Sequence, residues 1–206
     1  MNIRGYSIPD GSSLTDWEYM LKEWLVLVEL YCQLMPGKAP YWHNESANVG
    51  IFSGAAQRCG WLAIEELPVG KKDYTGQSWH GRLDLWLCST ARPHTKFAIE
   101  FKMGWSPLNG IRGVSTANDY LKKACNDASN VVVHDNENRV GVVFCVPRLN
   151  ALSGSNIESS IEELLDGLQS RSYDAMAYCF PEVTRQLKEK SGKDIYPGII
   201  LLARTV

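Results

Sequence analysis

The stretch LDLWLCSTARPHTKFAIEFKMGW, from Leu83 to Trp105, contains two apolar segments joined by a short connection. Each segment carries one acid, Asp84 in the first and Glu100 in the second, and Lys102 follows two positions after Glu100. Both segments are rich in aliphatic and aromatic residues, which favours β-strands. Charged groups within buried strands are costly unless other charges compensate them. The stretch therefore predicts two neighbouring strands that carry a polar site.

Alternation of side chains along a strand places these charges on defined faces. Glu100 and Lys102 share one face of the predicted strand 96–103, and Asp84 can lie beside Glu100 if the two strands pair. The opposite faces carry apolar residues, which are Phe97, Ile99, Phe101 and Met103 in one strand and Leu83, Leu85 and Leu87 in the other. Two adjacent carboxylates repel each other unless a cation joins them. Hard oxygen ligands of this kind predict a site for Mg²⁺ or Mn²⁺.

The remaining sequence predicts an α/β protein with a mixed central sheet flanked by helices on both faces. Apolar periodicity predicts helices over 15–34, 44–58, 116–129 and 155–170. Short apolar runs predict strands over 61–69, 82–88, 96–103, 139–149 and within 196–206, while 173–180 is ambiguous. The Thr15–Glu18 spacing predicts a capping box at the first helix, and residues 104–114 are expected to form a mobile glycine-bearing loop.

Composition narrows the class of protein. A length of 206 residues fits one domain, with a core at 44–149, an N-terminal helical elaboration at 1–43 and a C-terminal elaboration at 150–206. A net charge of −2 argues against a strongly basic nucleic-acid coat, although a local basic patch suffices for binding. Six scattered cysteines without a metal-binding spacing predict reduced thiols and a cytoplasmic location. We expect no signal peptide and no membrane segment.

Glu45 is a further candidate acid. It lies on, or at the margin of, the apolar stripe of the predicted helix 44–58, near the favourable end of the helix dipole. Spacing alone leaves open whether Glu45 faces the sheet or the solvent.

The order helix, three strands, helix, strand over about 44–149 resembles the PD-(D/E)XK nuclease superfamily. Asp84 matches the acid of the second core strand, Glu100 to Lys102 matches the E-x-K of the third, and Glu45 matches the acid of the first core helix. Leu83 stands where the proline of the family name would be, at a position that varies in the superfamily. The later helix has no Q-x-x-x-Y element, because Thr116 precedes Tyr120 at that spacing, which leaves the subfamily undetermined.

The resemblance implies a restriction-endonuclease-like core and metal-dependent hydrolysis of phosphodiester bonds, with DNA rather than RNA as the expected substrate. It implies that Mg²⁺ or Mn²⁺ is held by Asp84, Glu100, Glu45 and the backbone carbonyl of Phe101. Lys102 would position a water molecule or help to deprotonate it. The implied catalytic residues are Glu45, Asp84, Glu100 and Lys102.

Candidate contacts to nucleic acid are basic or aromatic residues near these strands, namely Lys71, Lys72, Arg82, Trp105 and Arg112. Two alternatives stay open. One is a catalytically silent member of the superfamily that acts as a binding or regulatory module through protein contacts. The other is an unrelated α/β protein in which Glu100 and Lys102 form a surface pair. The sequence also leaves open a homodimer or another protein partner.

Overall fold

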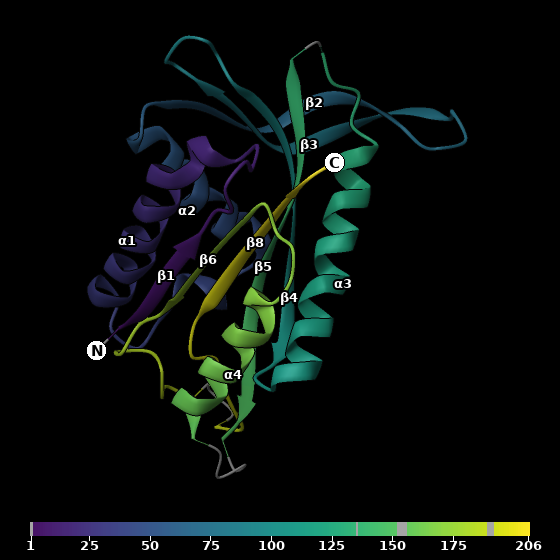
Figure 1. Cartoon of the computed structure of the whole chain (residues 1–206). Helices are drawn as coiled ribbons and strands as arrows, with labels where there is room; N and C mark the ends of the chain where they lie inside the picture. The colour runs from purple at the N-terminus through teal and green to yellow at the C-terminus, as the bar shows by residue number, and fades with distance from the viewer. Residues whose placement is uncertain (1, 135, 152–155, 189–191) are drawn as a thin grey trace.

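The computed structural model describes residues 2–134, 136–151, 156–188 and 192–206 (Figure 1). Its helices are α1 (Glu18–Leu34), α2 (Glu45–Arg58), α3 (Gly110–Ser129) and α4 (Ile157–Gln169), with the 3-10 turns η1 (Thr15–Trp17) and η2 (Pro40–Trp42). Its strands are β1 (Ile3–Ser7), β2 (Trp61–Lys72), β3 (Ser78–Ser89), β4 (Lys96–Pro107), β5 (Glu137–Asn150), β6 (Ala175–Phe180), β7 (Asp194–Ile195) and β8 (Ile199–Thr205).

The strands form one mixed sheet with the order β1-β6-β8-β5-β4-β3-β2, and β7 pairs with the end of β5. Strands β4 and β5 are parallel, and the other paired strands are antiparallel. A parallel pair requires a crossover connection, which α3 supplies. The continuous apolar composition of β5 fits this position, because β5 lies between two strands and is covered on both faces.

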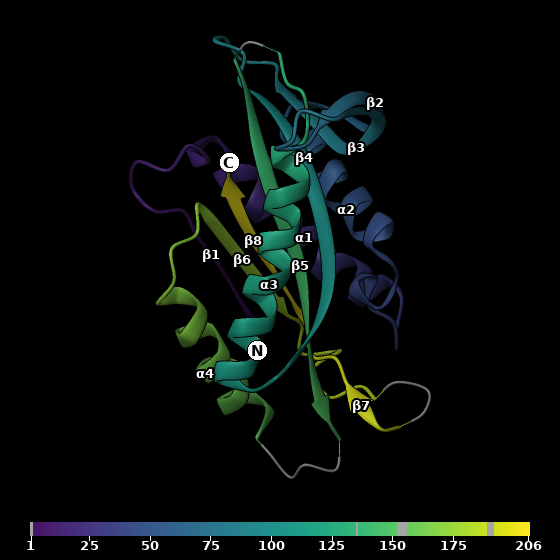
Figure 2. The same ribbon diagram turned by 90° about the vertical axis from the view of Figure 1, so that its right-hand side faces the viewer.

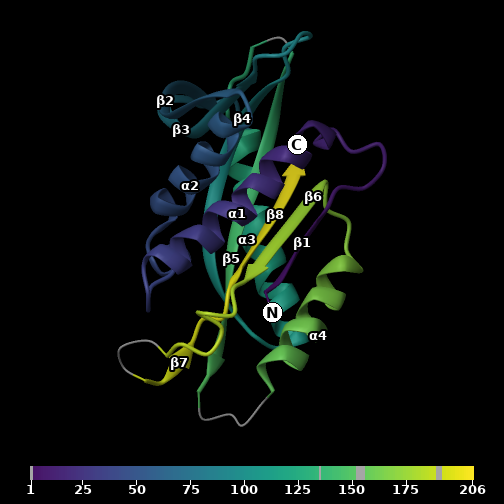
Figure 3. The same ribbon diagram turned by 90° about the vertical axis from the view of Figure 1, so that its left-hand side faces the viewer.

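Helices cover both faces of the sheet, so the predicted α/β class and mixed sheet are confirmed. Helices α1 and α2 pack on one face (Figure 3), and α3 and α4 pack on the other (Figure 2). The first layer is centred on aromatic rings from η1, α2 and the sheet, which include Trp17, Phe52, Phe97, Phe101 and Phe144. Among the described residues, no helix has the length and apolar character that a membrane span requires.

The β2–β3 hairpin leaves the plane of the sheet and curls over the α3 side (Figure 1). Glu66 of β2 has φ 54° and lies opposite Asp84, where the pairing is interrupted between Glu65–Leu85 and Leu67–Leu83 without a change of register. This left-handed backbone conformation departs from extended strand geometry and changes the direction of the strand. The bent end of β2 then pairs with the segment after α3, where the Lys72 amide donates to the Asn130 carbonyl at 2.7 Å.

Several local predictions are wrong. Residues 104–107 continue β4, and α3 begins at Gly110, so most of the predicted loop 104–114 is regular structure. No side chain caps η1 or α1, and the Thr15 hydroxyl donates instead to the Ser12 carbonyl. Leu83 does not join the cluster of Leu85 and Leu87, because β3 turns away from β4 before it reaches Leu83. Strand β1, at the sheet edge, lies within the segment predicted to be helical, and the ambiguous segment 173–180 contains β6.

Close packing of α3 on the sheet gives a test of this arrangement. Gly141 of β5 lies directly beneath the α3 backbone at Ala124 and Cys125, and a Cβ at this position would collide with it. We expect Gly141→Ala to lower the free energy of unfolding by about 2–3 kcal/mol. The control is Gly50→Ala, on the exposed face of α2 with nothing near the added Cβ, which should be neutral or stabilising by up to about 1 kcal/mol. Urea denaturation measures both values, and an equal effect of the two substitutions would contradict the packing described.

Candidate functional site

The candidate site lies where β3 leaves β4. The last residue pair between them is Leu85–Ile99, whereas β4 stays paired with β5 as far as Pro107. Backbone groups on the β3 side of β4 therefore lose their strand partner beyond Ile99. Buried amides need acceptors, and two side chains supply them. Asp84 Oδ2 accepts from the Phe101 amide at 2.7 Å, and Glu45 Oε2 accepts from the Met103 amide at 2.6 Å.

Glu45 reaches β4 because of how α2 begins. Asn44 caps the helix by accepting from the Ala47 amide at 3.0 Å, which places Glu45 in the first turn. Its side chain is partly buried against the edge of β4. Burial raises the pKa of Glu45, while the Lys102 charge and the Met103 amide oppose that rise. Helical spacing left open whether Glu45 faces the sheet or the solvent, and the structure places it on the sheet side.

Glu100 is the most buried acid of the group, at 3% exposure. Its Oε1 accepts from Lys71 Nζ at 2.7 Å, a contact made possible by the curl of β2. Burial raises the pKa of Glu100 to about 7, and the charge of Asp84 adds to the rise while Lys71 and Lys102 oppose it. Burial also raises the pKa of Asp84, against the Phe101 amide and the same two lysines.

Lys102 lies between the acids and α3. Its Nζ is 2.7 Å from Asp127 Oδ2 and donates to the Phe101 carbonyl at 2.9 Å. Burial lowers the pKa of Lys102, but the hydrogen bond and charge of Asp127 outweigh it and leave the pKa raised, so the side chain is an ammonium. Asp127 was not predicted as a site residue. Its place beside Lys102 depends on how α3 crosses the sheet. The pattern of residues within one segment does not predict that crossing.

The structure brings together Glu45, Asp84, Glu100 and Lys102, and adds Lys71 and Asp127 to them. Lys71, predicted to contact nucleic acid from a rim, is instead inside the site. Among the remaining candidates for nucleic-acid contact, Lys72 and Arg82 are exposed, and Arg82 pairs with Glu66 at 3.4 Å.

Trp105 and Arg112 lie farther from the carboxylates. Trp105 is 43% exposed and packs edge-on against Tyr196, with ring centroids 4.9 Å apart. Arg112 is in the first turn of α3, whereas Asp127 is near its end, which separates them by about 22 Å along the helix axis. Arg112 is therefore not part of the immediate site.

The donor set can be compared with the predicted metal. Asp84, Glu100 and the Phe101 carbonyl offer oxygen atoms only, which is the chemistry that Mg²⁺ and Mn²⁺ prefer. Among the described residues, no three His, Cys, Asp or Glu side chains converge closely enough to hold a metal ion. A site formed by two carboxylates and one backbone carbonyl requires only two acidic side chains, so it is compatible with this finding. The donors therefore fit a divalent ion in kind, with Glu100 and the Phe101 carbonyl now bound by lysine ammonium groups.

Comparison with known proteins does not assign the chain to a family. We found no match to a protein-family model, to a curated protein or to a solved structure.

The burial of Glu100 predicts a pH effect on stability. Its pKa is about 7 in the folded protein and ordinarily 4.5, so between these values the unfolded chain releases a proton that the folded chain keeps. Stability therefore falls as pH rises through this window. We expect wild type to lose stability relative to Glu100→Gln between pH 4.5 and pH 7, measured by urea denaturation. A difference that is constant with pH, or that moves in favour of wild type as pH rises, would contradict the prediction.

Proposed function

We propose that the protein is a metal-dependent nuclease with a restriction-endonuclease-like core of PD-(D/E)XK type, formed by α2, β2, β3, β4, α3 and β5. One observation carries the proposal: Asp84, Glu100 and Lys102, which match the motif in sequence, meet Glu45 at the edge that β3 leaves open on β4. These residues lie on three separate elements, and a chance sequence pattern would not require them to converge.

The charge of the cluster supports a cation. Four carboxylates, from Glu45, Asp84, Glu100 and Asp127, surround the ammonium groups of Lys71 and Lys102. When fully ionised, the cluster has an excess of two negative charges. In a partly desolvated site such an excess is unfavourable, and one divalent ion would offset it. Burial is the main cause of the raised pKa of Glu45, Asp84 and Glu100, and a bound cation would oppose that rise.

Each residue has a role in the proposed reaction. Asp84, Glu100 and the Phe101 carbonyl would hold Mg²⁺ or Mn²⁺, and Glu45 would contribute to the shell through a water molecule. The metal ion would polarise the scissile phosphate and lower the pKa of a bound water molecule. Lys102 would orient that water and counter the negative charge of the transition state. Asp127 is a positioning residue, because it fixes the Lys102 ammonium. DNA is proposed as the substrate rather than RNA because members of the superfamily act mostly on DNA.

A second candidate function is a catalytically silent module that acts through protein contacts. The ion pairs favour it, because Lys71 pairs with Glu100 and Asp127 pairs with Lys102. Glu100 and Lys102 therefore each have a charged partner without a metal ion. In that case the cluster would be a structural feature of the fold.

Cleavage assays test the first function. Single- and double-stranded DNA and RNA are incubated with Mg²⁺ or Mn²⁺, and we expect metal-dependent cleavage that EDTA abolishes. Asp84→Asn, Glu100→Gln and Lys102→Met should each lower the rate by about 100-fold or more. The matched control is Glu162→Gln, an exposed acid of α4 whose substitution should leave the rate unchanged. A folded wild-type protein that cuts none of these substrates would rule out the nuclease.

Metal binding distinguishes the two functions without a substrate. Lys71 Nζ competes with a cation for Glu100 Oε1. We therefore expect Lys71→Met to tighten Mn²⁺ binding about three- to tenfold in titration calorimetry at pH 8. Lys72→Met removes an exposed neighbouring charge that is outside the site and should change the affinity little. Absence of Mn²⁺ binding in both variants and in wild type would favour the silent module.

A further inference from the structure

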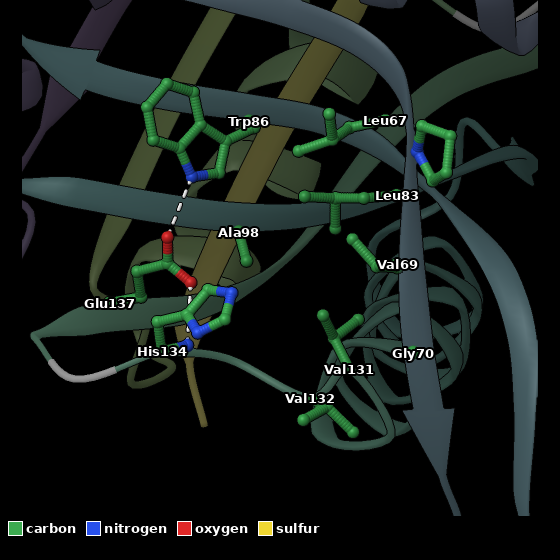
Figure 4. A pocket seen from close by; sticks show the side chains of 11 residues that line it. Leu67, Val69, Gly70, Leu83, Trp86, Ala98, Val131, Val132, His134 and Glu137 are labelled. Atoms are coloured by element: carbon green, nitrogen blue, oxygen red, sulfur yellow. Dashed lines mark hydrogen bonds between the residues drawn. The ribbon is translucent and has the colours of Figure 1, made fainter.

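A cavity of about 250 Å³ lies beneath the curled part of the β2–β3 hairpin (Figure 4). Leu83 and Ala98, each 1% exposed, and Val131, 2% exposed, are the most buried of its lining residues. Trp86 and Glu137 form one side, and aliphatic side chains face them from the opposite side (Figure 4). Pockets for drug-sized ligands are typically about 300–1,000 Å³. This cavity is therefore suited to one planar ring system rather than to a larger ligand.

Backbone and side-chain hydrogen bonds hold the cavity open in its present form. The Val132 amide donates to the Gly70 carbonyl at 2.9 Å, which ties the hairpin to the segment after α3. Trp86 Nε1 donates to Glu137 Oε1 at 3.0 Å, and the His134 amide donates to Glu137 Oε2 at 3.0 Å. A ligand would meet walls that are already ordered, which reduces the entropic cost of binding.

The cavity adjoins the candidate site on β4 and β3. Ala98 lines the cavity, and Glu100 is the next residue on the same face of β4. On β3, the lining residues Leu83 and Trp86 flank Asp84 in sequence. Residues two apart on a strand are separated by about 6.6 Å. One nucleotide can bridge this separation between its phosphate and its base.

The same junction occurs on β2. Gly70 lines the cavity, and Lys71, the next residue, binds Glu100. On each of β2, β3 and β4, a residue that lines the cavity is therefore a neighbour, in sequence or on the same face, of a residue of the candidate site. None of the lining residues belongs to a helix. A phosphate bound through a divalent ion at Asp84 and Glu100 would place a neighbouring base at the cavity entrance.

We propose that this cavity binds one unpaired nucleobase, belonging to the nucleotide whose phosphate lies at Asp84 and Glu100. The inference rests on the proposed nuclease function and names its substrate as single-stranded nucleic acid. Apolar walls and the Trp86 indole match the faces of a base, while Glu137 keeps lone pairs that can accept from the base edge. A base inside a duplex is paired and stacked, so it could enter only after extrusion from the helix.

An abasic substrate separates base binding from phosphate binding. Single-stranded oligonucleotides carry either a normal or an abasic residue at one defined position, and cleavage at that position is measured. We expect wild type to cut the normal substrate about tenfold faster, the effect of losing one stacked base. Val132→Phe, which places a ring at the cavity from a residue 53% exposed, should lower the rate on the normal substrate to that on the abasic one.

The control is Leu62→Phe, because Leu62 is also 53% exposed, lies on β2 and does not line the cavity. It should keep the wild-type preference for the normal substrate. Equal rates on the two substrates in wild type, or an unchanged preference in Val132→Phe, would overturn the cavity proposal while leaving the nuclease intact.

A binding measurement covers the case in which no substrate is cut. Deoxyadenosine monophosphate is titrated with Mn²⁺ present, and the part of the tryptophan fluorescence change that Trp86→Phe removes reports stacking at Trp86. Quenching in wild type and Leu62→Phe that is lost in Val132→Phe would support the base cavity although the nuclease had failed. Absence of quenching in wild type, together with absence of cleavage, would overturn both proposals.

Discussion

The open edge of β4 determines the character of this molecule. Beyond Ile99 the strand has a neighbour on one side only, so the amides of Phe101 and Met103 need other acceptors. Carboxylates from Asp84 and Glu45 take the place of strand carbonyls. An acid in this role brings a negative charge into a partly buried place, and that charge requires a cation nearby. The lysines of the site follow from this requirement.

The bent hairpin links the edge to the rest of the site. If β3 had stayed flat against β4 beyond Leu85, strand carbonyls would have satisfied β4 and left no place for the acids. The left-handed conformation at Glu66 accompanies the turn of the hairpin over the α3 side, where Lys71 reaches Glu100 and the backbone pairs with the segment 130–132. The same bend therefore accounts for the exposed edge, the buried ion pair and the cavity beside it.

Local chemistry made much of this arrangement predictable. Alternation along 96–103 placed Glu100 and Lys102 together, and the period of 44–58 brought Glu45 to the margin of a buried stripe. Lys71 and Asp127 were different, because their positions depend on the hairpin bend and on the crossing of α3 over the sheet. Both are long-range consequences of packing, which a pattern of spacing within one segment does not contain. For the same reason spacing alone could not show that most of α3 separates Arg112, a predicted nucleic-acid contact, from Asp127.

The ion pairs and the proposed function are compatible, because a preformed cluster can exchange one cation for another. Glu100 is nearly inaccessible to solvent, so its carboxylate needs a charged partner whenever it ionises. Lys71 supplies one partner from a strand end that faces the cavity as well as the acid. A divalent ion at Glu100 would release the Lys71 ammonium beside the place proposed for a phosphate. A lysine that neutralises the empty site would then become a ligand for substrate, without any change in the fold.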